Sequence, residues 1–112
     1  MDFAERAARN EEVFRDVNMR IEQGVKMHDV PGEALYHCEC DSASCFEMVS
    51  LAGADYERVA AERYQFVIAP GHEDPEIERV LERHESYLVV EKIGEARKQL
   101  ERDHPQQRHK AP

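Results

Sequence analysis

The chain has 112 residues, 41% of them hydrophobic and 35% charged, which fits a single domain with a small core. Its formal net charge of −9 argues against nucleic acid as a partner, because binding to phosphates relies on clustered cations. No apolar run approaches the ~18 residues of a membrane span, and the charged N-terminal sequence does not resemble a secretory signal, so we expect a cytoplasmic protein with reduced thiols.

Residues 3–23 are predicted to form an amphipathic helix that ends near Gly24. An apolar stripe recurs along it at helical spacing and consists of Val13, Phe14, Val17 and Ile21. This stripe either packs on the rest of its own domain or pairs with another protein or a second copy of the chain. Both alternatives stay open at this level.

The next segment is predicted to be a β-hairpin. Val30-Pro31-Gly32 is typical of a turn, and a strand that begins at Ala34 is expected to carry Cys38 and Cys40. The polar DSAS loop then leads into a second strand over about 45–50. This arrangement places the thiols at the tip of the hairpin.

The remaining elements alternate between helix and strand. We predict a helix over 52–63, a strand over 65–69 and a strand over 86–93. A short helix is expected to begin at Pro75, and a frayed helix to follow Gly94. The pattern indicates an α+β fold, in which a small antiparallel sheet packs against the N-terminal helix and one or two further helices.

The chain is thereby divided into three segments. They are an N-terminal amphipathic helix over residues 1–24, an α+β domain with a zinc site at a hairpin tip over residues 25–96, and a flexible tail over residues 97–112. The tail is assigned on its composition, because DHPQQRHKAP offers almost no apolar residue for a core.

All three cysteines lie in the segment HCECDSASC, residues 37–45. Side chains two residues apart on a strand point to the same face, so Cys38 and Cys40 should converge, and the loop returns Cys45 towards them. Three sulfurs can then bind one zinc ion at ~2.3 Å. A disulfide is disfavoured because the number of cysteines is odd and the expected compartment is reducing. The polar and acidic neighbours of these cysteines also differ from those of core residues.

Three thiolates leave one position of a tetrahedral zinc site to be filled. The candidate ligands are His28, His37, His72 and His84. His37 should face away from the cysteines, because neighbouring residues of a strand point to opposite sides. His72 follows a predicted strand and a Pro-Gly break, where loop ligands are usually presented. It is therefore the leading candidate, although spacing alone does not exclude the others.

Residues 10–94 contain a series of short motifs. They are Asn10-Glu11, Phe14-Arg15, Val17-Asn18, Cys38-Glu39-Cys40, Cys45, Asp55-Tyr56-Glu57, Phe66-Val67, Pro70-Gly71-His72, Tyr87 and Val89-Val90-Glu91-Lys92. In this combination the chain resembles a family of short, uncharacterised bacterial proteins. The resemblance implies a metal site formed by Cys38, Cys40, Cys45 and His72, and it brings no known activity.

The expected function follows from such a closed site. Four protein ligands indicate a structural zinc ion, and the chain has no H-E-x-x-H, G-x-S-x-G or phosphate-binding glycine loop. We expect a non-enzymatic, zinc-stabilised interaction or regulatory module that contacts another protein, or itself, through the N-terminal helix. The first alternative is a thiol-based redox or metal sensor that releases zinc on oxidation. The second is a small zinc-dependent enzyme with an open metal position.

Overall fold

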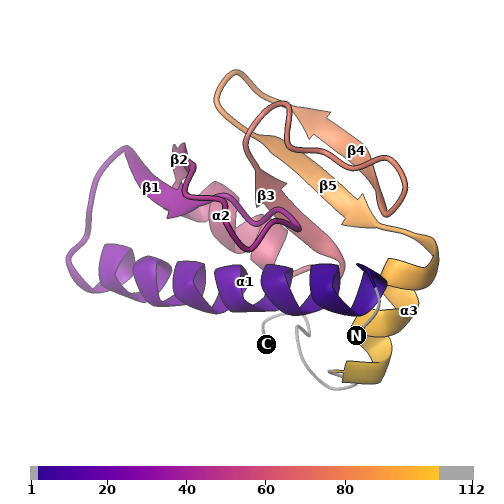
Figure 1. The fold of residues 1–112 in the computed structure, drawn as a ribbon. Coiled ribbons are helices and arrows are strands. Elements are labelled where there is room, and N and C mark those ends of the chain that lie inside the picture. The colour runs from indigo at the N-terminus through magenta and orange to yellow at the C-terminus, as the bar shows by residue number, and fades with distance from the viewer. Residues whose placement is uncertain (1–2, 104–112) are drawn as a thin grey trace.

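The structure is a computed structural model that describes residues 3–103, with the side chains of residues 9–102. The α+β class predicted from the sequence is confirmed (Figure 1). In chain order the elements are α1 (Phe3–Met27), β1 (Glu33–His37), β2 (Met48–Ala52), α2 (Gly53–Ala60), β3 (Gln65–Ile68), β4 (Glu78–Arg83), β5 (Leu88–Lys92) and α3 (Gly94–Asp103). No helix in this described range is long and apolar enough to cross a membrane.

The strands form two antiparallel sheets. β1 and β2 make a hairpin in which Tyr36 lies opposite Val49, and the second sheet has the strand order β3-β5-β4. The inner residues of both sheets share one core, to which the second sheet contributes Phe66, Val67 and Val90, among others. Because neither sheet can bury its apolar face alone, the two sheets and the helices stabilise one another.

The prediction of a short helix that begins at Pro75 is wrong, because residues 78–83 form the edge strand β4. The spacing of apolar residues that suggested a helix arises from a β-bulge between Val80 and Glu82, which interrupts the twofold alternation of the strand. The inner face of β4 also carries a buried acid, Glu78, whose partner is Lys92 on β5. An apolar pattern cannot reveal a strand that buries a charged pair.

The helix α1 is longer than predicted, and Gly24 lies inside it. Figure 1 shows α1 lying across the hairpin and reaching α3 near its own N-terminal end. The apolar stripe does not form the centre of the buried face of α1, since Val13 is 53% exposed and Val17 is 42% exposed. That centre is polar and is formed by the buried residues Glu11, Arg15, Asn18 and Glu22.

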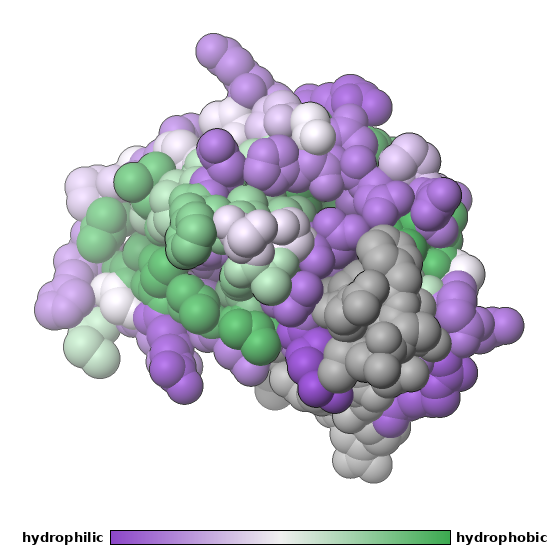
Figure 2. All heavy atoms as spheres, viewed as in Figure 1, coloured by the Kyte–Doolittle hydropathy of each residue, from purple (hydrophilic) through white to green (hydrophobic). Residues whose placement is uncertain are grey.

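The exposed part of the stripe adjoins the outer face of the hairpin. Phe14 stacks on His37 with ring centroids 4.2 Å apart, and Leu35 and Met48 lie on the same face of the hairpin as His37. Figure 2 shows hydrophobic residues gathered over α1 and the hairpin. The molecule therefore presents an apolar face there.

The helix predicted after Gly94 is present as α3, in which Ala96 and Leu100 are buried. α3 includes residues 97–103, which the sequence analysis assigned to the tail. The rest of that segment, residues 104–112, lies outside the described residues.

Candidate metal centre

The three cysteines lie in the loop that joins β1 to β2, here called the ligand loop (residues 38–47). The expectation that a strand carries Cys38 and Cys40 is wrong, because β1 ends at His37. Cys38 N donates a hydrogen bond to Glu47 O at 2.9 Å, which extends the hairpin pairing by one step. Glu39 N then donates to Val67 O at 2.8 Å, so the chain leaves β2 and pairs with β3 instead. This change of partner brings the cysteines to the junction of the two sheets.

The fourth residue, His72, belongs to the turn that follows β3. His72 N donates a hydrogen bond to Ala69 O at 3.1 Å, and Gly71 adopts a positive φ of 91° that favours glycine. The backbone N–H of Ala69 donates to Cys38 Sγ at 3.1 Å, which ties this turn to the ligand loop. The turn therefore presents the imidazole of His72 to the sulfurs.

The side chains of Cys38, Cys40, Cys45 and His72 form one cluster. Their ligand atoms all lie within 4.8 Å of one another, close enough to hold a metal ion. His72 Nδ1 lies 3.5 Å from Cys38 Sγ and 3.6 Å from Cys45 Sγ. Ligands about 2.0–2.3 Å from a tetrahedral zinc ion are roughly 3.6 Å apart, so the observed spacing fits such an ion.

The protonation of the thiols shows why the cluster favours a cation. The pKa of Cys40 is lowered to about 4, chiefly because the thiol of Cys38 donates a hydrogen bond to it. The same hydrogen bond, together with burial, raises the pKa of Cys38, and burial raises the pKa of Cys45. Among the three sulfurs, the thiolate form is therefore most favoured at Cys40. A metal ion that binds all three sulfurs displaces the thiol protons.

The side chain of Glu39, between Cys38 and Cys40, points into the protein and is fully buried. Its carboxylate accepts hydrogen bonds from Asn18 Nδ2 at 2.9 Å, from the Tyr56 hydroxyl at 2.7 Å and from Val67 N at 3.0 Å. The guanidinium of Arg15 lies 3.9 Å away and is also buried. A buried carboxylate with this many donors is well satisfied, and it anchors the ligand loop to α1, α2 and β3.

The other three candidate histidines lie apart from the cluster. His37 stacks on Phe14, and its Nδ1 lies 2.6 Å from Cys38 O. His84 stacks on Tyr87 and its Nε2 lies 2.8 Å from Glu82, while His28 follows α1 and is exposed. The structure therefore brings together the four residues that the resemblance implied and leaves out the alternatives.

No protein-family model matches the chain, and neither a curated protein nor a solved structure does. The family resemblance noted in the sequence stays a prediction.

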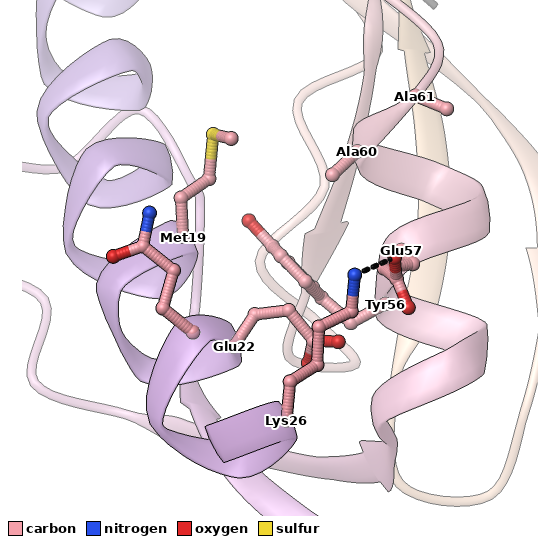
Figure 3. A pocket seen from close by; sticks show the side chains of 8 residues that line it. Met19, Glu22, Lys26, Tyr56, Glu57, Ala60 and Ala61 are labelled. Atoms are coloured by element: carbon pink, nitrogen blue, oxygen red, sulfur yellow. Dashed lines mark ion pairs between the residues drawn. The ribbon is translucent and has the colours of Figure 1, made fainter. Parts of the chain in front are cut away.

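A separate groove of about 330 Å³ lies between α1 and α2 (Figure 3). The ring of Tyr56 extends from α2 towards α1, and an ion pair between Lys26 and Glu57 joins the two helices, with an N–O distance of 2.5 Å. None of the residues that line the groove belongs to the cluster. Tyr56 connects the two features, because its hydroxyl donates to Glu39.

Sequence reasoning missed the residues that hold the ligand loop, chiefly Asn18 and Glu39. A signal for Asn18 was present, since the polar residues Glu11, Arg15, Asn18 and Glu22 recur at helical spacing along α1. Such a stripe usually indicates a solvated face. Only the positions of their partners show that this one is buried.

Proposed function

We propose that this chain is a zinc-binding module in which Cys38, Cys40, Cys45 and His72 hold one structural Zn²⁺. The observation that carries the proposal is the convergence of three sulfurs and one imidazole nitrogen within 4.8 Å, from a loop and a turn that are distant in sequence. Thiolate ligands select soft or borderline metals such as zinc over magnesium or calcium. A mixed set of three sulfurs and one nitrogen is a common structural zinc site.

A structural role is favoured over a catalytic one by the number of protein ligands. Catalytic zinc keeps a position for water, whereas His72 supplies a fourth protein ligand here. Three thiolates also donate electron density to the metal and weaken it as a Lewis acid. We therefore infer a non-enzymatic role, in which zinc joins the ligand loop to the turn after β3.

A module of this kind acts through its surface, and we infer that it contacts another protein or a second copy of itself. The support is the apolar face beside α1, where Leu35 is 60% exposed and Met48 is 44% exposed. Exposed apolar residues that gather on one face mark interaction sites more often than scattered ones do. The N-terminal helix, through Val13 and Val17, contributes one side of this face.

A redox sensor is the second candidate function, favoured by the spacing of the sulfurs. Two zinc-bound thiolates this close can lose two electrons to a peroxide and form a disulfide, while the peroxide takes up two protons and leaves as two waters. The ion would then lose two ligands and dissociate. Cys45 is the least buried of the three cysteines, so an oxidant would approach the cluster from its side. Stoichiometric zinc release after peroxide treatment would support this candidate.

Metal analysis of the purified chain tests the proposal. We expect one zinc per chain in the wild type, and a large loss of zinc in His72→Ala and in Cys45→Ser. His84→Ala is the matched control, because His84 is a histidine whose Nε2 bonds to Glu82 outside the cluster. A wild type without zinc, or a His72→Ala variant that keeps zinc as tightly as His84→Ala does, would contradict the ligand assignment.

A further inference from the structure

The ligand loop contains no helix or strand of its own, and its shape is imposed partly by α1. Three polar side chains of α1, spaced along one face, reach the loop or its neighbours: Asn10, Arg15 and Asn18. Their targets are His37, Glu39 and Asp41, which flank Cys38 and Cys40. The helix thus contacts the loop where the backbone enters the cluster and again where it leaves Cys40.

Asn18 holds the backbone immediately before Cys38. Its Oδ1 accepts a hydrogen bond from His37 N at 2.6 Å, and its Nδ2 donates to His37 O at 2.7 Å. One amide side chain therefore satisfies both backbone groups of His37, as a neighbouring strand would. Because Asn18 is fully buried, water cannot replace these bonds, and the orientation of the following peptide is set by the helix.

The amide of Asn18 also donates a hydrogen bond to Glu39 Oε2 at 2.9 Å, so it holds the residue after Cys38 as well. Glu39 points into the protein while Cys38 and Cys40 point to the cluster. Fixing this carboxylate therefore fixes the direction of both flanking thiols. Farther along the loop, Asn10 Nδ2 donates to Asp41 O at 2.9 Å, which holds the residue after Cys40.

We propose that Asn18 is a positioning residue for the metal, and that the docking of α1 and the binding of zinc are coupled. This inference rests on the proposed zinc site. Groups that orient metal ligands from outside the coordination sphere typically contribute about 10- to 100-fold to metal affinity. Coupling is reciprocal, so zinc must tighten the docking of α1 by the same factor by which docked α1 strengthens zinc binding.

The experiment measures zinc affinity by competition with a chromogenic chelator in the full chain. Asn18→Asp keeps the shape of the side chain but replaces the donor with a charged acceptor beside Glu39, and Asn18→Ala removes both groups. We expect a loss of about 10- to 100-fold in each. Asn10→Ala removes a single hydrogen bond, so it is a milder variant that stays informative if the Asn18 variants do not fold.

The control is Ile77→Ala, which removes buried apolar volume in a cluster with Ala96, apart from the ligand loop. It lowers overall stability, and we expect it to leave the zinc affinity of the folded chain unchanged. Two further measurements report on positioning itself. The absorption spectrum of the Co²⁺-loaded chain should change in Asn18→Asp and not in Ile77→Ala. Zinc should slow hydrogen exchange in α1 of the wild type more than in the Asn18 variants.

A wild type that binds no zinc would overturn the proposed function itself. If the wild type binds zinc and the folded Asn18 and Asn10 variants bind it with equal affinity, only the present inference fails. It also fails if Ile77→Ala loses as much affinity as Asn18→Ala does, because general stability would then explain the effect.

Discussion

At the scale of single residues, the most unusual group is the carboxyl of Glu11. It is completely buried and pairs with Lys92, while Glu78 and Asp41 add negative charge nearby. Burial raises the pKa of Glu11 from its ordinary value of 4.5 to about 8, and the attraction of Lys92 only partly offsets this shift. Near neutral pH the neutral form of Glu11 is therefore favoured in the folded state.

This shift predicts the pH dependence of a Glu11→Gln variant. Because the folded pKa lies above the unfolded one, the contribution of Glu11 to stability is fully present below pH 4.5 and is lost as the pH rises to about 8. Glutamine does not titrate, so the free energy of unfolding of the wild type should fall relative to that of the variant over this interval. Urea unfolding at several pH values measures the difference. A difference independent of pH would contradict the assignment.

At the scale of elements, a buried charged cluster fastens α1 to the second sheet. Lys92 on β5 contacts Glu11 on α1 and Glu78 on β4, and it is fully buried. Burial alone would lower the pKa of Lys92, but its interactions with Glu11 and Glu78 outweigh that effect and the pKa is raised. One ammonium thus joins three elements.

Replacing Lys92 with methionine should destabilise the protein strongly. The substitution leaves the buried carboxylate of Glu78 without its cation and removes the ammonium beside Glu11, and breaking a buried pair typically costs about 3–5 kcal/mol. Lys26→Met is the matched control, because Lys26 is 59% exposed in its pair with Glu57 and such pairs contribute about 0–1 kcal/mol. Urea unfolding of both variants measures the loss in the free energy of unfolding. An equal loss in the two variants would contradict a larger contribution from the buried cluster.

At the scale of the whole molecule, the proposed zinc ion would strengthen a junction that the hydrogen bond from Ala69 N to Cys38 Sγ already makes. The ligand loop and the turn of His72 have irregular backbones, and they meet at the junction of the two sheets. A chain of 112 residues has a small core, so we expect a bound metal to contribute a large share of its stability. Structural zinc contributes ~10 kcal/mol or more to the folding of small peptides.

Removing zinc with a chelator should therefore lower the melting temperature markedly. The effect should be reversed by adding zinc and should be absent in His72→Ala, which has already lost a ligand. Circular dichroism or scanning calorimetry of the same sample, with and without chelator, gives the measurement. An unchanged melting temperature after verified zinc removal would show that the metal has no structural role.

The features that could be predicted from the sequence are those that depend on residues close together in the chain. Cysteines grouped over residues 38–45 are unusual enough to indicate a metal, whatever the fold around them. Turn residues and apolar runs likewise predicted α1, α2, β3 and β5 with small errors at their ends, and they predicted a hairpin whose strands were wrongly extended over the cysteines. These features depend on neighbours in sequence, so the α+β class and the thiol ligands could be read without coordinates.

The tertiary structure alone decided which polar groups are buried and which histidine meets the sulfurs. Asn18, Glu39 and Lys92 are ordinary surface residues by type, and burying each of them becomes favourable only because a distant segment supplies its partner. For the same reason β4 was misread as a helix, and the sequence left open whether the apolar stripe of α1 packs on its own domain or against a partner. The free-energy cost of burying a polar or charged side chain is offset only by partners that the fold brings close, so it cannot be judged from neighbours in the sequence.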